Sequence, residues 1–418
     1  MKTQTLKGFR DFLPQDARKR QYVISKLKSV FEQFGFEPLE TPTLEYEEVL
    51  AGKYGEEGEK LMYRFEDNGQ RRVAMRYDQT VPLARVVAQY QNELPKPFKR
   101  YQIQNVWRAE NTQKGRYREF LQCDIDTVGV DSALADAELL ALIAKGYEAL
   151  GFTDYKILVN DRSVFTQLVN EEKAIKEKDL PAIVRAIDKL KKIGKEKVLE
   201  EIIRSGISTE QATYIMQTIE YQQPTERIEL IISNAEALGL SRDRIEFIPT
   251  LARGMDYYTG IIIEVEIPAY PVGSVGGGGR YDKLLGMFTD KEFPAVGFAF
   301  GFDRTMEAMD ALELFPEDLA QATSKVLVTI FSEDLQTNAI QVSSQFREKN
   351  INTEIYLGEI KEKNPLEKQL KYAIQKNIPY VIVLGPEEVK KNIVTLKNIQ
   401  THEQQQITIE EAIKLLRH

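Results

Sequence analysis

Apolar residues recur at helical spacing near the start of the chain. Over residues 17–34 they fall on one face of a helix, and Gly35 follows as a natural end. The apolar positions on that face are Val23, Ile24, Leu27, Val30, Phe31 and Phe34. The same spacing returns over residues 132–150, where Asp131 or Ser132 would be the N-cap. We therefore predict an amphipathic helix in each of these two segments.

Short runs of β-type residues dominate other parts of the chain. They occupy residues 73–77, much of residues 100–126, and residues 250–304. Within the second of these parts, two such runs flank a polar loop from Asn111 to Gly115. This arrangement predicts a β-hairpin that begins near residue 100.

The composition changes between and after these β-rich parts. Residues 165–240 are rich in Lys and Glu and have helical apolar spacing, which indicates a helical insertion. The charge-rich, apolar-poor stretch 315–324 is typical of a linker. In residues 325–418 apolar strands alternate with helices, which predicts a small α/β domain with a largely parallel sheet.

Counts of two residue types narrow the possible chemistry. The 418 residues include one cysteine, Cys123, so an internal disulfide and a CxxC zinc site are excluded. The two histidines, His402 and His418, both lie near the C-terminus. Catalysis elsewhere in the chain therefore cannot use a histidine base, a Ser-His-Asp triad or a histidine-ligated metal. No residue is selected as a metal ligand.

The charge balance argues against binding of a polyanion over the whole surface. The net charge is −8, and residues 325–418 are close to neutral. A nucleic acid would have to be held by local basic patches. No apolar stretch approaches the roughly 20 residues that a membrane-spanning helix needs, and the first residues lack an apolar signal segment. We expect a cytoplasmic protein that makes no membrane contact.

The predicted hairpin carries polar side chains on one face, because alternate residues of a strand share a face. On the first strand these are Gln102, Gln104, Val106 and Arg108, and on the second they are Arg118, Phe120, Gln122, Asp124 and Asp126. Together with Arg116 in the loop, this face would offer guanidinium groups, an aromatic ring and hydrogen-bond acceptors. These groups suit a phosphate, a flat base and a small polar ligand. The alternative is a solvent-facing hairpin with surface ion pairs. Cys123 lies between these positions on the second strand, so its side chain points to the opposite face, as expected of a buried structural cysteine.

Two readings fit the sequence MRYDQT at residues 75–80. It could be a strand that ends in Asp78 and Thr80 at the edge of a site. Alternatively, Thr80 could be the N-cap of a helix that continues through residues 81–90, with Pro82 in its first turn. Both readings can hold together, since strand ends and helix starts commonly line sites.

The stretch LARGMDYYTGIIIEVEI, residues 251–267, places polar residues directly before a strand. Its apolar face would be formed by Ile261, Ile263, Val265 and Ile267. Strand parity puts Tyr258 on the opposite, more polar face and Tyr257 toward the core. Arg253 lies just before the strand, where a loop could aim it. Asp256 has no assigned role, although it could orient Arg253.

Two glycine-containing segments follow. The run from Gly276 to Gly279 could bring backbone close to a ligand or form a flexible hairpin, but it is not a Walker A motif. Residues 295–304, AVGFAFGFDR, are typical of a strand that leads into a helix. Arg304 would open that helix and project toward whatever lies at its end, and Asp303 would stand in its favourable first turn.

Taken in order, these segments resemble the class II aminoacyl-tRNA synthetases and, among them, the histidyl-tRNA synthetase family. The first helix with Pro42 resembles motif 1, VWRAENTQKGRYREF resembles motif 2, and GFAFGFDR resembles motif 3. The stretches LARGMDYYTG and GGGGRYD resemble motifs of the histidine-specific members. The resemblance covers nearly the whole chain, including KQLKYAIQKNIPYVIVLG near the C-terminus.

The resemblance implies an α+β fold with a class II antiparallel catalytic sheet flanked by helices. The catalytic domain would comprise residues 1–164, with motifs 1 and 2, and residues 241–320, with the histidine-specific motifs and motif 3. A helical insertion domain would cover residues 165–240, and an anticodon-binding α/β domain residues 325–418. The implied reaction joins L-histidine to tRNA-His through a histidyl-adenylate, using ATP and Mg²⁺, in a homodimer.

The resemblance also implies roles for individual residues. Arg108 would bind the α-phosphate of ATP, Arg116 and Arg304 its phosphate tail, Phe120 its adenine, and Glu110 would lie in the same ATP site. The histidine site would comprise Asp78, Thr80 and Gln122 at the amino group, Asp126 and Tyr258 at the imidazole, with Tyr281 closing the pocket. Arg253 would reach both the substrate carboxylate and the α-phosphate, which makes Arg253 and Arg108 the predicted catalytic residues.

One alternative from another functional class remains. A non-catalytic paralogue acts as the regulatory subunit of the ATP phosphoribosyltransferase that starts histidine biosynthesis. Members of that group resemble the catalytic core but usually lack the C-terminal domain and lose synthetase-specific residues. Residues 325–418 are present here, and Arg253, Tyr258, Tyr281 and Arg304 are in place. Both features favour the enzyme.

Overall fold

The computed structural model describes residues 3–112, 115–169, 175–253, 258–288, 292–360 and 364–417. Two compact units make up the chain, Met1–Leu314 and Phe315–His418. None of the helices within the described ranges has both the length and the apolar character needed to cross a membrane.

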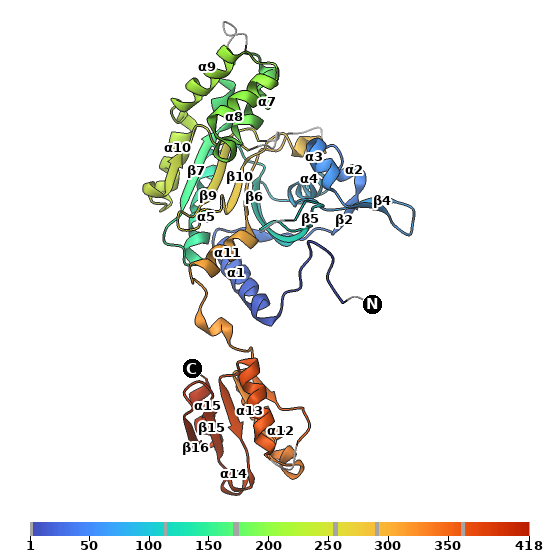
Figure 1. Cartoon of the computed structure of the whole chain (residues 1–418), viewed down its shortest axis with the longest axis vertical. Helices are drawn as coiled ribbons and strands as arrows, with labels where there is room; N and C mark the ends of the chain where they lie inside the picture. Colours follow the sequence, from blue (N-terminus) through green and yellow to red (C-terminus); the bar gives the residue numbers. More distant parts are fainter. Residues whose placement is uncertain are drawn as a thin grey trace. The chain divides into compact units, whose positions relative to one another are not determined.

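A mixed eight-stranded sheet forms the centre of the first unit (Figure 1). Its order is β1 (Glu37–Pro38), β5 (Phe98–Trp107), β6 (Glu119–Val128), β11 (Ala295–Phe300), β10 (Gly276–Arg280), β9 (Ile261–Glu266), β7 (Lys156–Asp161) and β8 (Ile245–Phe247). The six central strands are antiparallel, and the two edge strands run parallel to their neighbours. The predicted antiparallel catalytic sheet is therefore confirmed, with short parallel strands added at its edges.

The predicted hairpin is confirmed as β5 and β6. Gln104 pairs with Gln122, and Val106 pairs with Phe120. Directly paired residues of an antiparallel ladder place their side chains on the same face. The polar positions of both strands therefore share one face, as predicted. Cys123 is fully buried on the other face, as its strand parity indicated.

A smaller sheet and several helices pack around the N-terminal half of the main sheet. The small sheet has the order β2 (Leu44–Tyr46), β4 (Arg72–Met75) and β3 (Arg64–Glu66). The helices are α1 (Pro14–Gln33), α2 (Glu47–Leu50), α3 (Gly55–Leu61), α4 (Thr80–Gln89) and α11 (Phe302–Ala311). Helix α1 starts three residues before its predicted position, because Pro14 is well suited to the first helical turn.

Helix α5 (Ala133–Ala149) is the most buried helix that packs on the main sheet, with ten of its residues buried. Ser132, one of the two predicted N-caps, accepts a hydrogen bond from the Leu134 backbone N–H at 3.1 Å. The Phe300 ring of β11 lies 5.3 Å from the Tyr147 ring of α5 and 5.6 Å from the Phe31 ring of α1. These aromatic contacts fix two helices that are distant in sequence on one strand of the sheet.

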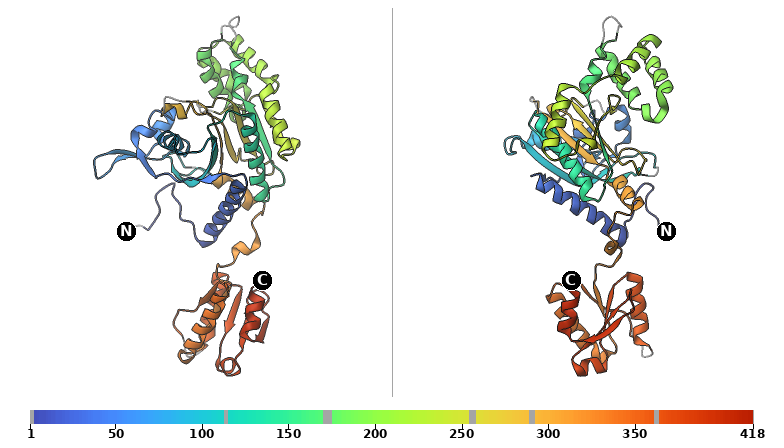
Figure 2. Two further views of the ribbon diagram at one scale, coloured as in Figure 1. Left: turned by 180° about the vertical axis from the view of Figure 1, so that it is seen from behind. Right: turned by 90° about the vertical axis from the view of Figure 1, so that its left-hand side faces the viewer.

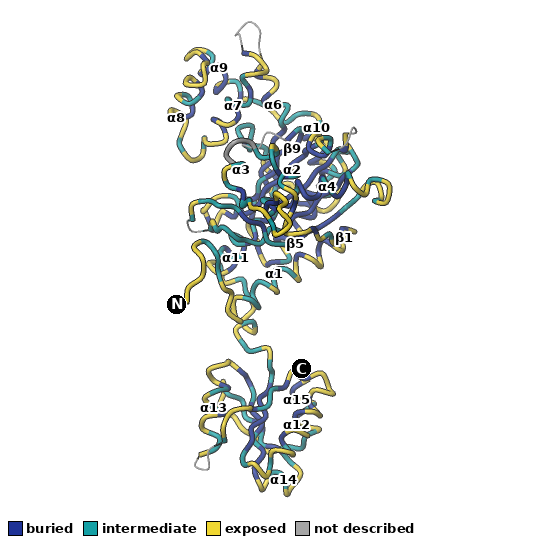
Figure 3. Tube along the Cα trace, turned by 90° about the vertical axis from the view of Figure 1, so that its right-hand side faces the viewer, coloured by how far each residue is buried: buried dark blue, intermediate teal, exposed yellow. Residues whose placement is uncertain are grey.

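A group of helices follows β7. Helices α6 (Arg162–Thr166), α7 (Leu180–Ile187), α8 (Leu190–Arg204) and α9 (Thr209–Glu220) share one apolar core, which also reaches Leu158 of β7 and Ile262 of β9. Helix α10 (Glu226–Ala237) instead packs along α5. Figure 3 shows the buried stretches of this unit concentrated along its strands, while the helices keep exposed outer faces.

The second unit is a five-stranded sheet with helices on both faces (Figure 2). Its strand order is β13 (Thr353–Ile355), β12 (Val326–Val328), β14 (Tyr380–Val383), β15 (Val394–Asn398) and β16 (Gln404–Ile407). The helices are α12 (Gln336–Glu348), α13 (Pro365–Lys376), α14 (Pro386–Lys391) and α15 (Ile409–Leu416). Only β13, β12 and β14 are mutually parallel. The predicted largely parallel sheet is thus mixed, because β14, β15 and β16 form an antiparallel meander.

Candidate active site

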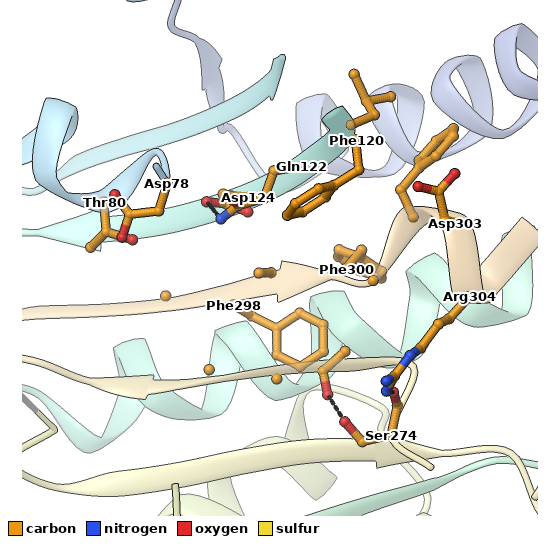
Figure 4. Close-up of a pocket in the computed structure, with 18 of the residues that line it drawn as sticks. Asp78, Thr80, Phe120, Gln122, Asp124, Ser274, Phe298, Phe300, Asp303 and Arg304 are labelled. Carbon is orange, nitrogen blue, oxygen red and sulfur yellow. Dashed lines mark hydrogen bonds between the residues drawn. The ribbon is translucent and has the colours of Figure 1, made fainter. Parts of the chain in front are cut away.

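A cavity of about 380 Å³ opens on the polar face of the main sheet. All twelve residues that the sequence suggested line it: Asp78, Thr80, Arg108, Glu110, Arg116, Phe120, Gln122, Asp126, Arg253, Tyr258, Tyr281 and Arg304. Figure 4 shows Asp78 and Thr80 toward one end, and Phe120 and Arg304 toward the other. The hairpin face is therefore the wall of a cavity, and the alternative of a solvent-facing hairpin is wrong.

Three glycines on the cavity face of β10 and β11 make room for three of these side chains. A Cβ on Gly277 would overlap with Nη1 of Arg253, and one on Gly297 would overlap with Oδ1 of Asp126. A Cβ on Gly279 would lie 2.9 Å from Cδ1 of Tyr258. Strand glycines often mark the close approach of another group. Here the approaching groups are side chains, so the glycine run belongs to a central strand and is not a flexible hairpin.

One end of the cavity is cationic and aromatic. Arg108 donates from Nε to the Tyr77 carbonyl oxygen at 3.0 Å, and its guanidinium lies 5.2 Å from the centre of the Phe120 ring. Arg304, in the first turn of α11, donates from Nη1 to the Ser274 carbonyl oxygen at 2.8 Å. These contacts hold the two guanidinium groups in defined orientations. A cationic, partly apolar end of this kind suits a phosphate chain attached to a flat base.

The loop after β5 adds a more exposed ion pair to this end. Arg116 lies 3.4 Å from Glu110, and 53 % of the Arg116 side chain is exposed. Exposed ion pairs contribute little to stability. A negatively charged ligand could therefore attract Arg116 away from Glu110 at small cost.

The opposite end of the cavity is acidic and buried. Asp78 accepts hydrogen bonds from the Tyr54 hydroxyl at 2.8 Å and from the Val81 backbone N–H at 3.1 Å. Asp126 accepts a hydrogen bond from the Tyr281 hydroxyl, and its Oδ2 lies 2.7 Å from Nη2 of Arg100. That last contact is an ion pair whose geometry does not meet the criteria of a hydrogen bond. Burial raises the pKa of both carboxyl groups above their ordinary values, and Arg100 acts in the opposite direction.

Arg253 lines the same cavity and lies over Gly277 of β10. Its Nη1 lies 3.4 Å from Oε1 of Glu264 on β9, and its guanidinium lies 5.8 Å from the centre of the Tyr258 ring. Burial raises the pKa of Glu264 above its ordinary value, while the Arg253 charge lowers it. The loop before β9 thus brings Arg253 over the sheet.

The N-terminal segment closes the cationic end from outside. Arg10 forms an ion pair with Asp303 of α11 at 2.8 Å, and its guanidinium stacks 3.3 Å from the centre of the Tyr117 ring. Both Asp303 and Tyr117 line the cavity. Arg20 of α1 adds a second ion pair to Asp303 at 3.3 Å. The start of the chain therefore ties the loop after β5 to the helix that carries Arg304.

Comparison with known protein families decides what this cavity belongs to. The family described as histidyl-tRNA synthetase matches residues 8–305, and the family described as anticodon binding domain matches residues 325–418. The chain belongs to the histidyl-tRNA synthetase family. It is therefore a class II aminoacyl-tRNA synthetase.

Individual relatives of this synthetase agree with the family match. A histidine–tRNA ligase of Cytophaga hutchinsonii is 38 % identical, over 98 % of each chain. A histidine–tRNA ligase of Rhodopirellula baltica is also 38 % identical, over 97 % of this chain and 95 % of the relative. The crystal structure of histidyl-tRNA synthetase from Nostoc sp. PCC 7120 superposes with a TM-score of 0.83 at 30 % identity and covers 99 % of both chains.

A further solved structure shares the fold alone. It is described as an ATP phosphoribosyltransferase regulatory subunit/histidyl-tRNA synthetase from Bacillus halodurans, with a TM-score of 0.74 at 22 % identity. The match covers 91 % of this chain and 98 % of that one. The regulatory-subunit alternative is consequently less supported than the synthetase, whose relatives match over their full length at higher identity.

Two expectations about the synthetase's cavity need correction or completion. Thr80 does not cap α4, because it is already the first residue of that helix, and Asp78 accepts the bond from the Val81 N–H instead. The preceding strand ends at Met75, so Asp78 lies in the connection between strand and helix. The predictions for Asp256 and Tyr257 fall outside the described residues.

Sequence reasoning missed three residues at the acidic end. Asp124 lines the cavity, Arg100 pairs with Asp126, and the Tyr54 hydroxyl donates to Asp78. Strand parity gave a signal for Asp124, which shares a face with Gln122 and Asp126. Arg100 has the same parity on β5, where it is the residue paired with Asp126. No local signal marked Tyr54, because it comes from a separate segment of chain.

Aminoacyl-tRNA synthetases use ATP and typically a divalent metal ion. The described residues contain no group of three or more His, Cys, Asp or Glu side chains placed to hold a metal. Mg²⁺ is usually bound by one or two carboxylates together with substrate phosphates and water. Glu110 beside the cationic end fits that pattern, so the residues present fit a metal ion that arrives with the nucleotide.

Proposed function

We propose that this synthetase joins L-histidine to tRNA-His in two steps at the described cavity. The observation that carries the proposal is the division of one cavity into a buried acidic end and a cationic, aromatic end, with Arg253 also in its lining. An amino acid with a positively charged ammonium group and an ATP molecule would occupy these ends side by side. Their reacting groups, a carboxylate and an α-phosphate, would then meet near Arg253.

In the first step a carboxylate oxygen of histidine attacks the α-phosphorus of ATP. The bond from that phosphorus to the bridging oxygen of the β-phosphate breaks, and pyrophosphate leaves with the electron pair. Negative charge spreads over phosphate oxygens in the transition state, and positioned guanidinium groups stabilise it. Arg108 and Arg253 are the proposed catalytic residues for this role, which needs no proton transfer by the protein.

The remaining residues of the cationic end would hold the nucleotide. Phe120 offers a ring for stacking on adenine, and Arg116 and Arg304 offer positive charge to the β- and γ-phosphates. Glu110 would act in the same site as a partner of Arg116 or of the metal ion. Mg²⁺ bound with the nucleotide would neutralise part of the phosphate charge.

The residues of the acidic end would select histidine. Asp78, Thr80 and Gln122 are proposed to bind its amino group, and Asp126 and Tyr258 its imidazole, with Tyr281 closing the pocket. The Tyr281 hydroxyl already donates to Asp126, which holds that carboxyl in place. A buried polar pocket rejects a ligand that cannot pair its groups by large factors.

In the second step a hydroxyl of the terminal ribose of the tRNA attacks the carbonyl carbon of the adenylate. The new ester bond forms as AMP leaves, and the hydroxyl proton is released. Residues 325–418 match an anticodon-binding family, which supports their proposed contact with the tRNA. We further propose a homodimer that works in the cytoplasm and makes no membrane contact.

Aminoacylation with labelled histidine tests this proposal. We expect the purified chain to attach histidine to tRNA-His in a reaction that needs both ATP and Mg²⁺. An inactive chain that instead stimulates an ATP phosphoribosyltransferase would favour the regulatory subunit. Size measurement in solution tests the homodimer separately.

A further inference from the structure

Asp124 is a cavity residue to which the resemblance gives no role. It lies on β6 between Gln122 and Asp126, and only 3 % of it is exposed. Its Oδ2 accepts a hydrogen bond from Nε2 of Gln122 at 2.7 Å. Its Oδ1 is buried and has no hydrogen-bond partner among the described residues. A buried carboxylate oxygen without a partner is costly, and in a cavity wall it points to a missing ligand group.

The hydrogen bond from Gln122 has a second consequence. Nε2 of Gln122 donates to Oδ2 of Asp124, so the amide nitrogen of Gln122 faces Asp124. The amide oxygen of Gln122 then points elsewhere, and it too is buried without a partner in the described part of the chain. Asp124 therefore fixes the orientation of the amide, and each of the two residues keeps one buried acceptor oxygen without a partner in the described part of the chain.

The charges around these acceptors favour a cation. Asp78, Asp124 and Asp126 all line this end of the cavity, and each is at most 4 % exposed. Arg100, which is fully buried, is the cationic side chain that acts on all three. Arg108 also acts on Asp78. Three carboxylates and these two guanidinium groups still leave an excess of negative charge, which a positively charged ligand would balance.

We infer that Asp124 is a specificity-determining residue that binds the α-ammonium group of the amino-acid substrate together with Gln122. This inference rests on the proposed function. An ammonium is a cation with three donors and no acceptor, which matches two buried acceptor oxygens. An imidazole that is mostly neutral at pH 7 needs both a donor and an acceptor. Asp126 is less suited to the ammonium, because Tyr281 and Arg100 already contact its two oxygens.

Calorimetry with two ligands distinguishes binding of the ammonium group from binding of the imidazole ring. One ligand is L-histidine, and the other is 3-(imidazol-4-yl)propionate, which keeps the ring and the carboxylate but lacks the amino group. We expect Asp124→Asn to weaken histidine binding at least tenfold and to change binding of the propionate less than about twofold, because only histidine loses a charge-assisted bond. The KM for ATP should not change.

Thr127→Val is the matched control on the same strand. Thr127 is 2 % exposed but does not line the cavity, so this near-isosteric change should leave both ligands unaffected. Asp124→Ser is the second variant if Asp124→Asn does not melt cooperatively, and the same ligand-specific loss is expected. Equal loss for both ligands, or no loss for either, would overturn the assignment of Asp124. A wild-type chain that binds no histidine would overturn the proposed function itself, and the inference with it.

Discussion

The guanidinium group of Arg253 passes directly above the Cα of Gly277. A Cβ at position 277 would overlap with Nη1 of Arg253 and lie 2.7 Å from its Cζ. Gly277 pairs with Glu264 on the neighbouring strand, and Glu264 is the ion-pair partner of Arg253. The strand glycine and the carboxylate together therefore define where the arginine lies. The glycine run, which could have formed a flexible hairpin, instead leaves space over the strand for a side chain.

Replacing Gly277 with alanine should impair catalysis more than stability. The new methyl group would meet the far end of a flexible side chain, so Arg253 would move and the backbone would not. A displacement of about 1 Å in a catalytic group can cost roughly a hundredfold in rate. We expect Gly277→Ala to lower histidine-dependent ATP–pyrophosphate exchange by about that factor, with little change in melting temperature.

Gly278→Ala is the contrasting variant. A Cβ at this neighbouring position would overlap with the Gly297 carbonyl oxygen and lie 2.7 Å from the Phe298 Cα, both in the backbone of β11. We expect this variant to lose stability. If both variants lost stability equally, or if Gly277→Ala kept normal exchange, Gly277 would not be the residue that leaves space for Arg253.

The sequence predicted those features of the site that depend on local periodicity. The polar face of the hairpin follows from strand alternation, and the register that aligns Gln104 with Gln122 keeps that face together. The family resemblance supplied the other cavity residues that were predicted. The relation of Arg253 to Gly277 could not be predicted, because it depends on the pairing of strands that are joined only in the folded chain.

Two failures have local physical causes. Thr80 was predicted to cap α4, but Asp78, two positions earlier, is an equally good capping residue and accepts the bond from the Val81 N–H. Strand β16 was not predicted because Gln404, Gln405 and Gln406 are exposed on the edge of the sheet. An edge strand of this kind lacks the apolar alternation on which strand prediction depends.

Arg10 should act on the cationic end of the cavity, the proposed ATP site, without touching substrate. It holds Asp303, which precedes Arg304, and it stacks on Tyr117. We expect Arg10→Ala to raise the KM for ATP severalfold while the KM for histidine stays within about twofold, because the acidic end does not contact Arg10. Arg10→Lys should restore only part of the effect, since an ammonium cannot bridge both partners as a planar guanidinium does.

The control for Arg10 is another ion pair to α11, formed by residues outside the cavity lining. Lys19 of α1 pairs with Asp310 of α11, and neither residue lines the cavity. Lys19→Ala should leave both KM values unchanged. A similar rise in both KM values for Arg10→Ala would mean that the residue stabilises the fold in general.

The buried ion pair of Arg280 and Asp136 should contribute strongly to stability. Nε of Arg280 donates to Oδ1 of Asp136 at 3.1 Å, and both side chains are almost fully buried. Arg227 of α10 donates to the other carboxylate oxygen at 3.0 Å. Removal of Asp136 leaves the buried Arg280 guanidinium with the more exposed carboxylates of Asp282 and Asp131, and breaking a buried ion pair costs about 3–5 kcal/mol. We expect Asp136→Ala to lower the free energy of unfolding in denaturant by that amount.

An exposed pair on the same helix provides the comparison. Lys145 and Glu148 are 2.7 Å apart, and each side chain is about half exposed. Lys145→Ala should cost less than about 1 kcal/mol. Equal losses of unfolding free energy in Asp136→Ala and Lys145→Ala would show that burial does not increase the contribution of an ion pair to stability.

The acidic end should make stability depend on pH in the substrate-free protein. Burial raises the pKa of Asp124 well above its ordinary value, as do the charges of Asp126 and Asp78, while Arg100 acts in the opposite direction. Because the folded state binds this proton more tightly than the unfolded chain, the stability contributed by Asp124 is full below the unfolded pKa of about 3.9. It is lost as the pH rises through the folded pKa.

Asp124→Asn removes this dependence. The free energy of unfolding of the variant should therefore rise relative to that of the wild type as the pH increases from about 4 to about 8, by about 1.4 kcal/mol for each unit of pKa difference removed. Denaturant titrations at several pH values measure this difference. A difference that is constant with pH, or that changes in the opposite direction, would show that Asp124 does not carry the raised pKa.

The cavity is proposed to activate histidine in preference to other amino acids. The most direct measurement is ATP–pyrophosphate exchange by the purified chain with a panel of amino acids, each tested with ATP and Mg²⁺. We predict rapid exchange with histidine and at least a thousandfold less with glutamine, asparagine or lysine, whose side chains cannot satisfy the buried ring-binding groups. Absence of exchange with histidine, or equal exchange with another amino acid, would contradict the account.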